Sequence, residues 1–244
     1  MQTIKLTLEY DGTNYAGWQR QADQPTVQAV LEQVIGQVTQ ATLAVVGAGR
    51  TDSGVHALGQ VASFRTERRL TPAEWMRALN GLLPDDICVR SVEFVPDDFH
   101  ARYSAMGKLY EYRILNRPDR SALDRDRAWH LRTALDQHAM GEAAECLIGR
   151  QDFSSFQGSP TDTRTPVCHM RQLSIRTKSD LIRIEVYADR FLKQMVRAIV
   201  GTLVEVGLGK RTPASLRDIL AARDRSVAGK TAPAHGLYLV RVDY

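Results

Sequence analysis

Long apolar runs are missing from this chain of 244 residues. No run approaches the roughly 18 consecutive apolar residues that a membrane-spanning helix needs. The first residues, MQTIKLTLEY, have neither the basic start nor the long apolar core of a signal peptide. We therefore expect a cytoplasmic protein with no membrane partner.

Cysteine is also scarce, and its positions exclude two kinds of site. The three cysteines, Cys88, Cys146 and Cys168, lie far apart in the sequence. An odd, scattered set supports neither a disulfide framework nor C-x-x-C metal spacing. His169 follows Cys168, but no second pair with ligand spacing accompanies it. The sequence therefore predicts no metal site.

The excess of positive charge is small. The chain has 32 Lys and Arg against 28 Asp and Glu, which gives a net charge of +4 and an isoelectric point of about 9.0. A nucleic-acid surface would have to come from clustering. Three groups of basic residues cluster in the sequence: Arg65, Arg68 and Arg69; Arg117, Arg120, Arg125, Arg127 and Arg132; and Arg176, Lys178, Arg183, Arg190, Lys193 and Arg197. Acidic residues interleave the second group, so a solvated, ion-paired surface explains it equally well.

The usual phosphate-binding motifs are absent, although one loop comes close. Residues 47–59 read GAGRTDSGVHALG, and Gly49 and Gly54 have the spacing of the two P-loop glycines. Val55 then follows where a P-loop needs Lys. In the dinucleotide fingerprint G-x-G-x-x-G, Asp52 takes the place of the third glycine. A carboxylate in such a loop would repel a phosphate, so Asp52 needs another explanation.

Hydrophobic periodicity predicts an α+β fold with a mainly antiparallel sheet. Strands are expected at 3–10, 43–46, 61–65, 87–94, 109–115, 170–175, 181–187 and 237–242, and helices at 26–38, 71–82, 134–147, 191–206 and 213–222. The pattern repeats, which indicates an N-terminal half at 1–104 and a C-terminal half at 105–244. Without a low-complexity linker, the halves should pack together, and clefts between packed halves are common ligand sites.

Asp52 is the only acidic residue between Glu32 and Glu67. It is either a turn residue that bonds its own backbone or a functional carboxylate. A strand feeds a stiff glycine-containing bend, and Arg50 would favour the ionised form, which suits a nucleophile or a base. His56 is either an acid–base partner or a structural histidine. No Ser or Cys in a nucleophile elbow accompanies them, so a hydrolase triad is poorly supported.

Aromatic and basic residues elsewhere allow two interpretations each. Tyr110 and Tyr112 face the same way, either as sheet core or as a platform on which an unstacked base stacks. Arg197 lies at the edge of an apolar helical arc. It either snorkels to solvent or is a half-buried cation for a carboxylate, with Asp52 a candidate partner. Residues 10–21, YDGTNYAGWQRQ, mix aromatic and basic residues in a way that suits RNA.

Several ordered motifs together resemble the bacterial tRNA pseudouridine synthase A family. They are EYDGTNYAGWQRQ near the start, GAGRTDSGVHALGQVASF around Asp52, FHARYSAMGKLYEYRI through Tyr110, QDFSSF at 151–156, RFLKQMVRAIVGTLVEVG through Arg197, and APAHGLYLVRVDY at the C-terminus. The resemblance covers nearly the whole chain, and GRTD-x-GVHA is highly specific. Ser53 stands where Ala is usual, a change of similar size.

The resemblance implies a fold and a substrate. It implies two ferredoxin-like, RNA-recognition-like halves related by a pseudo-two-fold axis, with helices on one face of the sheet and the active cleft between the halves. It also implies a homodimer that acts on uridine in the anticodon stem-loop of tRNA, at positions 38 to 40. No cofactor and no metal are implied.

The resemblance also assigns roles to four residues. Asp52 matches the nucleophile, and Tyr110 matches the tyrosine that stacks on the target base. Arg197 matches the basic residue that pairs with the catalytic carboxylate. Arg50 matches the loop arginine that helps to replace the flipped base and hold the RNA. Whether Asp52 attacks C1′, attacks C6 or acts as a base is left open.

Two other functions would use the same residues differently. A non-catalytic RNA-binding protein would use the basic clusters and the tyrosines but would tolerate Asp52→Ala. A small-molecule hydrolase would use Asp52 with His56, would lose activity with His56→Ala, and would not bind RNA. A non-catalytic RNA-binding function does not explain why a lone carboxylate lies in a rigid loop.

Overall fold

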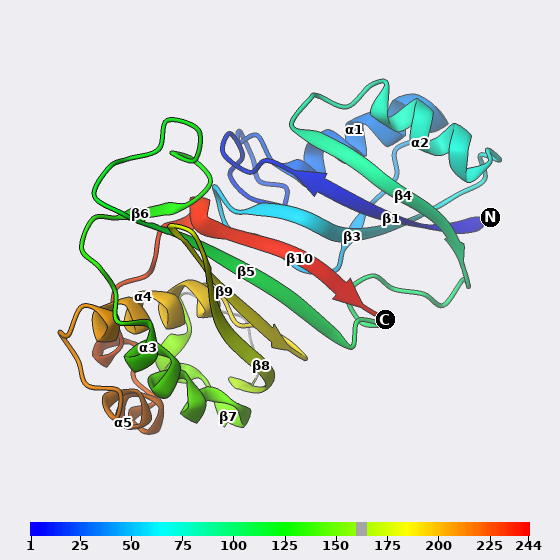
Figure 1. The fold of residues 1–244 in the computed structure, drawn as a ribbon. Helices are drawn as coiled ribbons and strands as arrows, with labels where there is room; N and C mark the ends of the chain where they lie inside the picture. Colours follow the sequence, from blue (N-terminus) through cyan, green and yellow to red (C-terminus); the bar gives the residue numbers. More distant parts are fainter. Residues whose placement is uncertain (160–164) are drawn as a thin grey trace. The chain divides into compact units, whose positions relative to one another are not determined.

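The computed structural model describes residues 1–159 and 165–244, and Figure 1 shows their course. The chain divides into two compact units. Met1–Met106 and Tyr238–Tyr244 form the first, and Gly107–Leu237 forms the second. These units differ from the two predicted halves in two respects: the junction lies two residues later, and the C-terminal strand groups with the first unit.

The first unit is built on a mixed sheet with the strand order β4–β1–β3–β10. β1 is antiparallel to both β3 and β4, β10 is parallel to β3, and the short β2 pairs with β3. Its elements are β1 (Gln2–Tyr10), α1 (Val27–Thr39), β2 (Val46–Gly47), β3 (His56–Thr66), α2 (Pro72–Asn80), β4 (Ile87–Val95) and β10 (Leu237–Asp243).

The core of this unit follows from strand alternation. Ile4, Leu6 and Leu8 of β1 are fully buried, as period-two patterning requires. Helices α1 and α2 lie on one face of the sheet (Figure 1). Trp75 of α2 packs against Phe64 of β3 with ring centroids 5.6 Å apart and planes at 76°. Aromatic pairs prefer this edge-to-face geometry, and it fixes α2 on the sheet.

The second unit contains an antiparallel sheet in the order β5–β9–β8–β7, with β6 parallel to β5. Its elements are β5 (Gly107–Asn116), β6 (Trp129–Leu131), α3 (Gln137–Ala144), β7 (Gly149–Asp152), β8 (Val167–Lys178), β9 (Leu181–Ala188), α4 (Met195–Gly207) and α5 (Ser215–Ala222). Helices α3, α4 and α5 gather on one side of it (Figure 1).

Helix α4 begins at Met195 and not at the predicted Phe191. Gln194 adopts a left-handed conformation with φ 59°, which interrupts the helical pattern immediately before it. An apolar sequence alone cannot show such a break, because the residues before Gln194 continue the same hydrophobic pattern.

The predicted fold class is confirmed at this level. The chain is an α+β protein with a mixed, mainly antiparallel sheet. Among the residues that the structure describes, no helix is both long enough and apolar enough to cross a membrane.

Candidate active site

Asp52 lies on the loop that connects β2 with β3 in the first unit. Residues that precede Asp52 in this loop are hydrogen-bonded to β3. The amide of Ala48 donates to the carbonyl of Val61 at 2.7 Å. The Gln60 side chain donates from Nε2 to the carbonyl of Gly49 at 2.9 Å. The approach to Asp52 is therefore fixed by hydrogen bonds, as expected for a stiff loop.

A second segment, residues 10–18, packs against the same loop. The Trp18 amide donates to the carbonyl of Thr51 at 3.1 Å, and the Gly54 amide donates to the carbonyl of Tyr15 at 3.3 Å. The hydroxyl of Tyr10 lies 2.8 Å from Thr51 Oγ1. The backbone on both sides of Asp52 is thus bonded to this segment.

Two glycines make this close packing possible. A Cβ on Gly12 would lie 2.0 Å from the carbonyl oxygen of Val55, and one on Gly17 would lie 2.5 Å from that of Thr51. Gly17 also has φ of +100°, a conformation that other residues rarely adopt. The loop and the segment could not approach each other this closely with any other residue at these positions.

Arg50 lies on the same loop and is exposed. Its Nε donates to Gln19 Oε1 at 3.2 Å. This bond links the loop arginine to residues 10–21. The structure therefore places Asp52 and Arg50 together on one loop of the first unit.

His56 has the surroundings of a structural histidine. It is buried, its Nδ1 accepts a hydrogen bond from the Gly12 amide at 3.1 Å, and its ring stacks on Tyr238 with centroids 4.8 Å apart. Asp11 Oδ1 also lies 3.1 Å from Nδ1. The ring is thus enclosed by contacts with the segment at Asp11 and Gly12 and with Tyr238 of β10. The structural interpretation of His56 is thus supported.

Tyr110 and Tyr112 differ in their surroundings although both lie on β5. The hydroxyl of Tyr112 donates to the carbonyl of Pro233 at 2.7 Å. Burial raises the pKa of Tyr112, against the opposing effect of the Arg197 charge. Tyr110 instead meets Phe191 edge-on, with centroids 4.9 Å apart and planes at 80°. Both rings are buried, Tyr112 completely and Tyr110 with 7% of its surface exposed, so Tyr112 belongs to the core and Tyr110 stays the candidate for a base platform.

Arg197 lies in the first turn of α4. Its Nε donates to the carbonyl of Ala232 at 2.8 Å, and its own carbonyl accepts from the Ala232 amide at 3.0 Å. Burial lowers the pKa of His235, and the charge of Arg197 lowers it further. Tyr110 and Arg197 both belong to the second unit. The expected pairing of Arg197 with Asp52 stays a prediction.

Known proteins resemble this chain over its whole length. A family model described as tRNA pseudouridine synthase matches residues 7–104 and 143–244. Proteins named tRNA pseudouridine synthase A are 46% identical in Ruminiclostridium cellulolyticum, over 245 residues, and 46% identical in Acetivibrio thermocellus, over 244 residues. Another in Rhodospirillum centenum is 48% identical over 245 residues. In all three cases the similarity covers 100% of this chain and 100% of the relative.

The chain belongs to the tRNA pseudouridine synthase A family. It is therefore an isomerase, as the resemblance predicted. The two stretches matched by the family model contain Asp52, Arg50 and Arg197. Tyr110 lies between them, in a part of the chain that only the full-length relatives cover.

The interpretation of residues 10–21 as an aromatic surface for RNA needs correction. The aromatic residues of 10–21 suggested an RNA-facing loop, yet Tyr10, Tyr15 and Trp18 are buried in the first unit. They pack under the Asp52 loop, where a Cβ on Gly47 would lie 2.4 Å from the Trp18 indole nitrogen. The regular alternation of β1 through Tyr10 was the available sign that this tyrosine faces the core.

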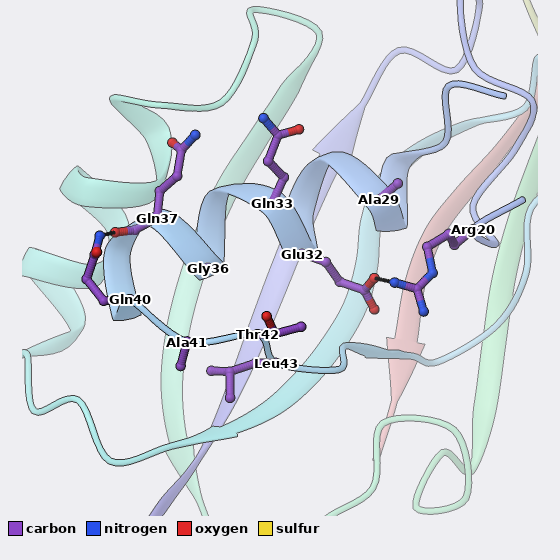
Figure 2. Close-up of a pocket in the computed structure, with 10 residues that line it drawn as sticks. All are labelled: Arg20, Ala29, Glu32, Gln33, Gly36, Gln37, Gln40, Ala41, Thr42 and Leu43. Atoms are coloured by element: carbon purple, nitrogen blue, oxygen red, sulfur yellow. Dashed lines mark hydrogen bonds and ion pairs between the residues drawn. The ribbon is translucent and has the colours of Figure 1, made fainter. Parts of the chain in front are cut away.

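Arg20, near the end of residues 10–21, is anchored to α1. Arg20 Nη1 lies 3.0 Å from Glu32 Oε2 of α1, as Figure 2 shows. The amide of Arg20 donates to Gln28 Oε1 at 2.9 Å. Arg20 and Glu32 line a shallow groove of about 610 Å³ beside α1. The pairing of Arg20 with a carboxylate makes this groove a poor phosphate site.

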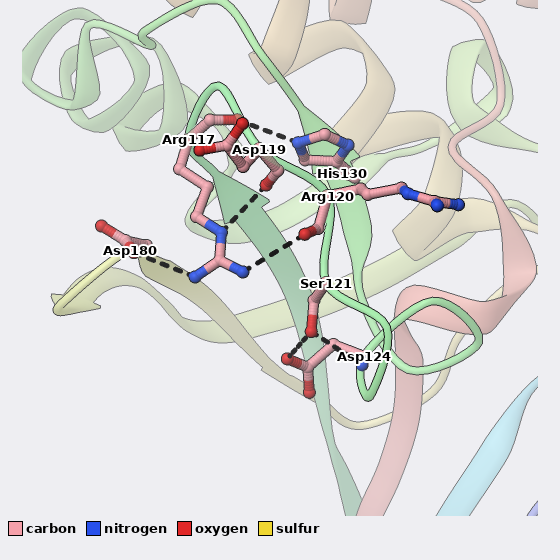
Figure 3. Close-up of polar contacts among 7 residues, drawn as sticks. All are labelled: Arg117, Asp119, Arg120, Ser121, Asp124, His130 and Asp180. Carbon is pink, nitrogen blue, oxygen red and sulfur yellow. Dashed lines mark hydrogen bonds and ion pairs between the residues drawn. The ribbon is translucent and has the colours of Figure 1, made fainter.

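The second basic cluster of the pseudouridine synthase contains a structural arginine and an exposed one. Figure 3 shows Arg117 bonded from Nε to the Asp119 carbonyl at 2.9 Å and paired with Asp180 at 3.4 Å. His130 Nε2 lies 2.9 Å from the Arg117 carbonyl. Arg120 is exposed, and its side chain points away from these contacts. Arg117 therefore orders the loop, while Arg120 faces solvent.

Metal ligands are not grouped in the part of the chain that the structure describes. No set of three or more His, Cys, Asp or Glu side chains lies close enough together there to hold a metal ion. The expectation that this pseudouridine synthase needs no cofactor remains a prediction.

Proposed function

We propose that this protein isomerises uridine to pseudouridine in the anticodon stem-loop of tRNA, at positions 38 to 40, without a cofactor. The observation that carries the proposal is the Asp52 loop. A single carboxylate is held there by backbone bonds on both of its flanks, at Thr51 and at Gly54. Family membership adds tRNA as the substrate.

The reaction explains why a carboxylate stands in a glycine-containing loop. The N1–C1′ bond of uridine breaks, the uracil turns, and a C5–C1′ bond forms. The proton lost from C5 is matched by the one gained at N1, so there is no net redox change. A carboxylate near the sugar suits this reaction as a covalent nucleophile on C1′, as a nucleophile on C6, or as a base that removes a sugar proton.

The other residues have roles that fit the same reaction. The target nucleotide must leave the RNA stack, which costs a few kcal/mol. Tyr110 is proposed to stack on the loose uracil, and Arg50 to help hold the RNA in place of the flipped base. Arg197 is proposed to pair with the catalytic carboxylate.

The larger assembly is part of the proposal. We propose two ferredoxin-like halves related by a pseudo-two-fold axis, a cleft between them, and a homodimer in the cytoplasm, where tRNA is found. Light scattering after size exclusion tests the dimer. It should give a mass of twice 27.3 kDa, and a mass of 27.3 kDa at all concentrations would rule the dimer out.

The decisive experiment uses an unmodified tRNA transcript with uridine at tRNA position 39. Purified protein and the Asp52→Asn variant are each incubated with it in EDTA without added cofactor. Pseudouridine is mapped by carbodiimide adducts that stop reverse transcription. A new stop in the anticodon arm with the unchanged protein alone is expected.

Binding measurements separate the competing functions. The Asp52→Asn and Asp52→Ala variants should lose isomerisation and still bind tRNA. An Asn variant that turns over at the normal rate would overturn the role of Asp52. No stop with either protein, despite tight tRNA binding, would favour a non-catalytic RNA-binding protein.

A further inference from the structure

Asp52 is flanked on both sides by residues that hydrogen-bond to the same segment, residues 10–18. On one side, the carbonyl of Thr51 accepts a hydrogen bond from the Trp18 amide. The hydroxyl of Thr51 is hydrogen-bonded to the hydroxyl of Tyr10. On the other side, the Gly54 amide and the Ser53 hydroxyl both donate to the Tyr15 carbonyl, at 3.3 and 3.2 Å. We call these contacts the loop clamp.

The clamp is closed further by the turn itself and by its outer anchor. The amide of Val55 donates to the Asp52 carbonyl at 3.1 Å, which completes a tight turn. The hydroxyl of Tyr15 donates to Asp86 Oδ1 at 2.6 Å, so the segment that holds the loop is itself held. Every backbone group named in the clamp therefore has a fixed partner.

Within the clamp, one contact joins two side chains. Tyr10 is 3% exposed and Thr51 is 6% exposed, and their hydroxyls lie 2.8 Å apart. Burial raises the pKa of Tyr10 to about 12, while hydrogen bonds from Thr51 and Gln60 oppose the shift. Tyr10 thus keeps its proton near neutral pH. Because this contact uses no backbone atom, it can be removed without deleting any backbone hydrogen bond of the clamp.

We propose that Tyr10 and Thr51 are positioning residues that hold the Asp52 carboxylate in its reactive orientation through the Tyr10–Thr51 hydroxyl pair. This rests on the proposed role of Asp52 as the reacting carboxylate. Neither residue touches the substrate in this mechanism. The pair fixes the residue directly before Asp52, and Gly17 lets the backbone approach close enough for Trp18 to fix the same residue.

The physical reason is the steep dependence of rate on geometry. A reacting group displaced by about 1 Å can lose about 100-fold in rate. The backbone of the loop carries the Asp52 side chain, so a looser Thr51 lowers the fraction of time in which Asp52 is aligned. Substrate binding, by contrast, depends on contacts made by other residues.

The test removes each hydroxyl with little change in shape. Tyr10→Phe and Thr51→Val each lose one half of the pair, and Thr51→Ser keeps a hydroxyl. We expect kcat to fall about tenfold in the first two, with the KM for tRNA within about twofold of the unchanged protein. Thr51→Ser should restore most of kcat. The double variant should be no slower than the slower single one, because both changes break one interaction.

A matched control is available in the same unit. The hydroxyl of Tyr244 donates to the carbonyl of Ala101 at 2.8 Å, outside the clamp. Tyr244→Phe removes a hydrogen bond of the same kind and should leave kcat unchanged. If Tyr10→Phe lowers kcat no more than Tyr244→Phe does, or if Thr51→Ser is as slow as Thr51→Val, the proposal is wrong.

A second measurement does not depend on activity. Hydrogen exchange of a peptide covering residues 47–56 should be about five- to tenfold faster in Tyr10→Phe and Thr51→Val, and unchanged in Tyr244→Phe. Unchanged exchange in all three variants would overturn the clamp. If the unchanged protein makes no pseudouridine, the proposed function is wrong. The exchange experiment still tests whether the Tyr10–Thr51 contact holds the loop.

Discussion

At the scale of single residues, two tyrosines two positions apart on β5 make different contacts. Tyr112 is closed into the core, where a Cβ on Gly236 would lie 2.7 Å from its ring. Tyr110 is oriented by an edge-to-face contact with Phe191. Such a contact fixes the plane of a ring, which is what a stacking platform requires.

The first prediction concerns the Tyr110 ring. Tyr110→Phe keeps the aromatic face, so its KM for tRNA should stay within about twofold of the unchanged protein. Tyr110→Ala should weaken tRNA binding by about 1–3 kcal/mol, the usual contribution of base stacking. Tyr112→Phe is the control and should lower the free energy of unfolding by about 1 kcal/mol without affecting KM. Equal binding by Tyr110→Ala and the unchanged protein would contradict stacking.

Sequence patterns at the residue scale singled out Asp52 as a candidate but did not show which contacts support its loop. The departure of Asp52 from both phosphate-binding motifs was visible in the letters of residues 47–59. The contact between Tyr10 and Thr51 was not visible, because it joins the end of β1 to a loop residue 41 positions further along the chain. Aromatic content alone cannot distinguish a ring that packs beneath a loop from one that faces RNA.

At the scale of elements, α4 lies close to the strap formed by residues 229–232. The Gly229 amide donates to Thr202 Oγ1 at 2.9 Å, and the Lys230 amide donates to Glu205 Oε1 at 3.3 Å. A Cβ on Gly201 would lie 1.7 Å from the Lys230 carbonyl oxygen. The same strap carries Ala232, which bonds Arg197. The position of Arg197 therefore depends on how closely α4 and the strap pack.

The second prediction compares two glycines in helices. Gly201→Ala forces the strap away and should lower the free energy of unfolding by about 1–3 kcal/mol, as overpacking does. Gly141 lies in α3, and a Cβ added there would meet nothing within 4 Å, so Gly141→Ala should raise the free energy of unfolding by up to about 1 kcal/mol. Urea unfolding of both variants measures this. Equal effects of the two changes would mean that the strap moves freely.

The third prediction concerns Glu205, which joins α4 to Arg211 and to the strap. Burial raises its pKa, but hydrogen bonds from Arg211 and from the Lys230 amide lower it more, and the net pKa lies below its usual range. A lowered pKa in the folded state stabilises the protein above the unfolded-state pKa, and this stabilisation is lost as pH falls through the folded-state pKa. Glu205→Gln should therefore be less stable than the unchanged protein near neutral pH, by roughly 1 kcal/mol.

The pH dependence of that difference is the check. Urea unfolding over a falling series of pH values should show the two proteins converging in stability as the pH passes through the folded-state pKa of Glu205, because the carboxylate then takes up a proton. A difference that stays constant over this range would show that the charge of Glu205 contributes nothing.

Periodicity predicted most of the helices and strands, and its failures have physical causes. β6 and β7 have three and four residues, too few for alternation to be recognised. β3 was expected only at 61–65 but begins at His56, because the polar and glycine residues of its first half hide the pattern. The parallel pairing of Tyr238 with His56 joins residues 182 positions apart, so local periodicity could not predict it.

At the scale of the whole molecule, the small net charge does not show which basic side chains can bind phosphate. Several arginines of the clusters have acidic partners, as in the pairs Arg117–Asp180 and Arg125–Asp126. Paired arginines contribute little to binding a phosphate, because the nearby carboxylate opposes it. The exposed Arg120 and Arg132 are better candidates for contacts with the tRNA backbone.

The last prediction tests this distribution through salt. Phosphate contacts release counterions, so the logarithm of the tRNA association constant should fall linearly with the logarithm of salt concentration. Arg120→Ala and Arg132→Ala should each reduce the slope by about 0.7–0.9, the value of one lost phosphate contact. Arg77→Ala, on α2 and outside the three clusters, is the control and should leave the slope unchanged. Fluorescence anisotropy with labelled tRNA measures all four proteins, and equal slopes would show that the second cluster is only a solvated, ion-paired surface.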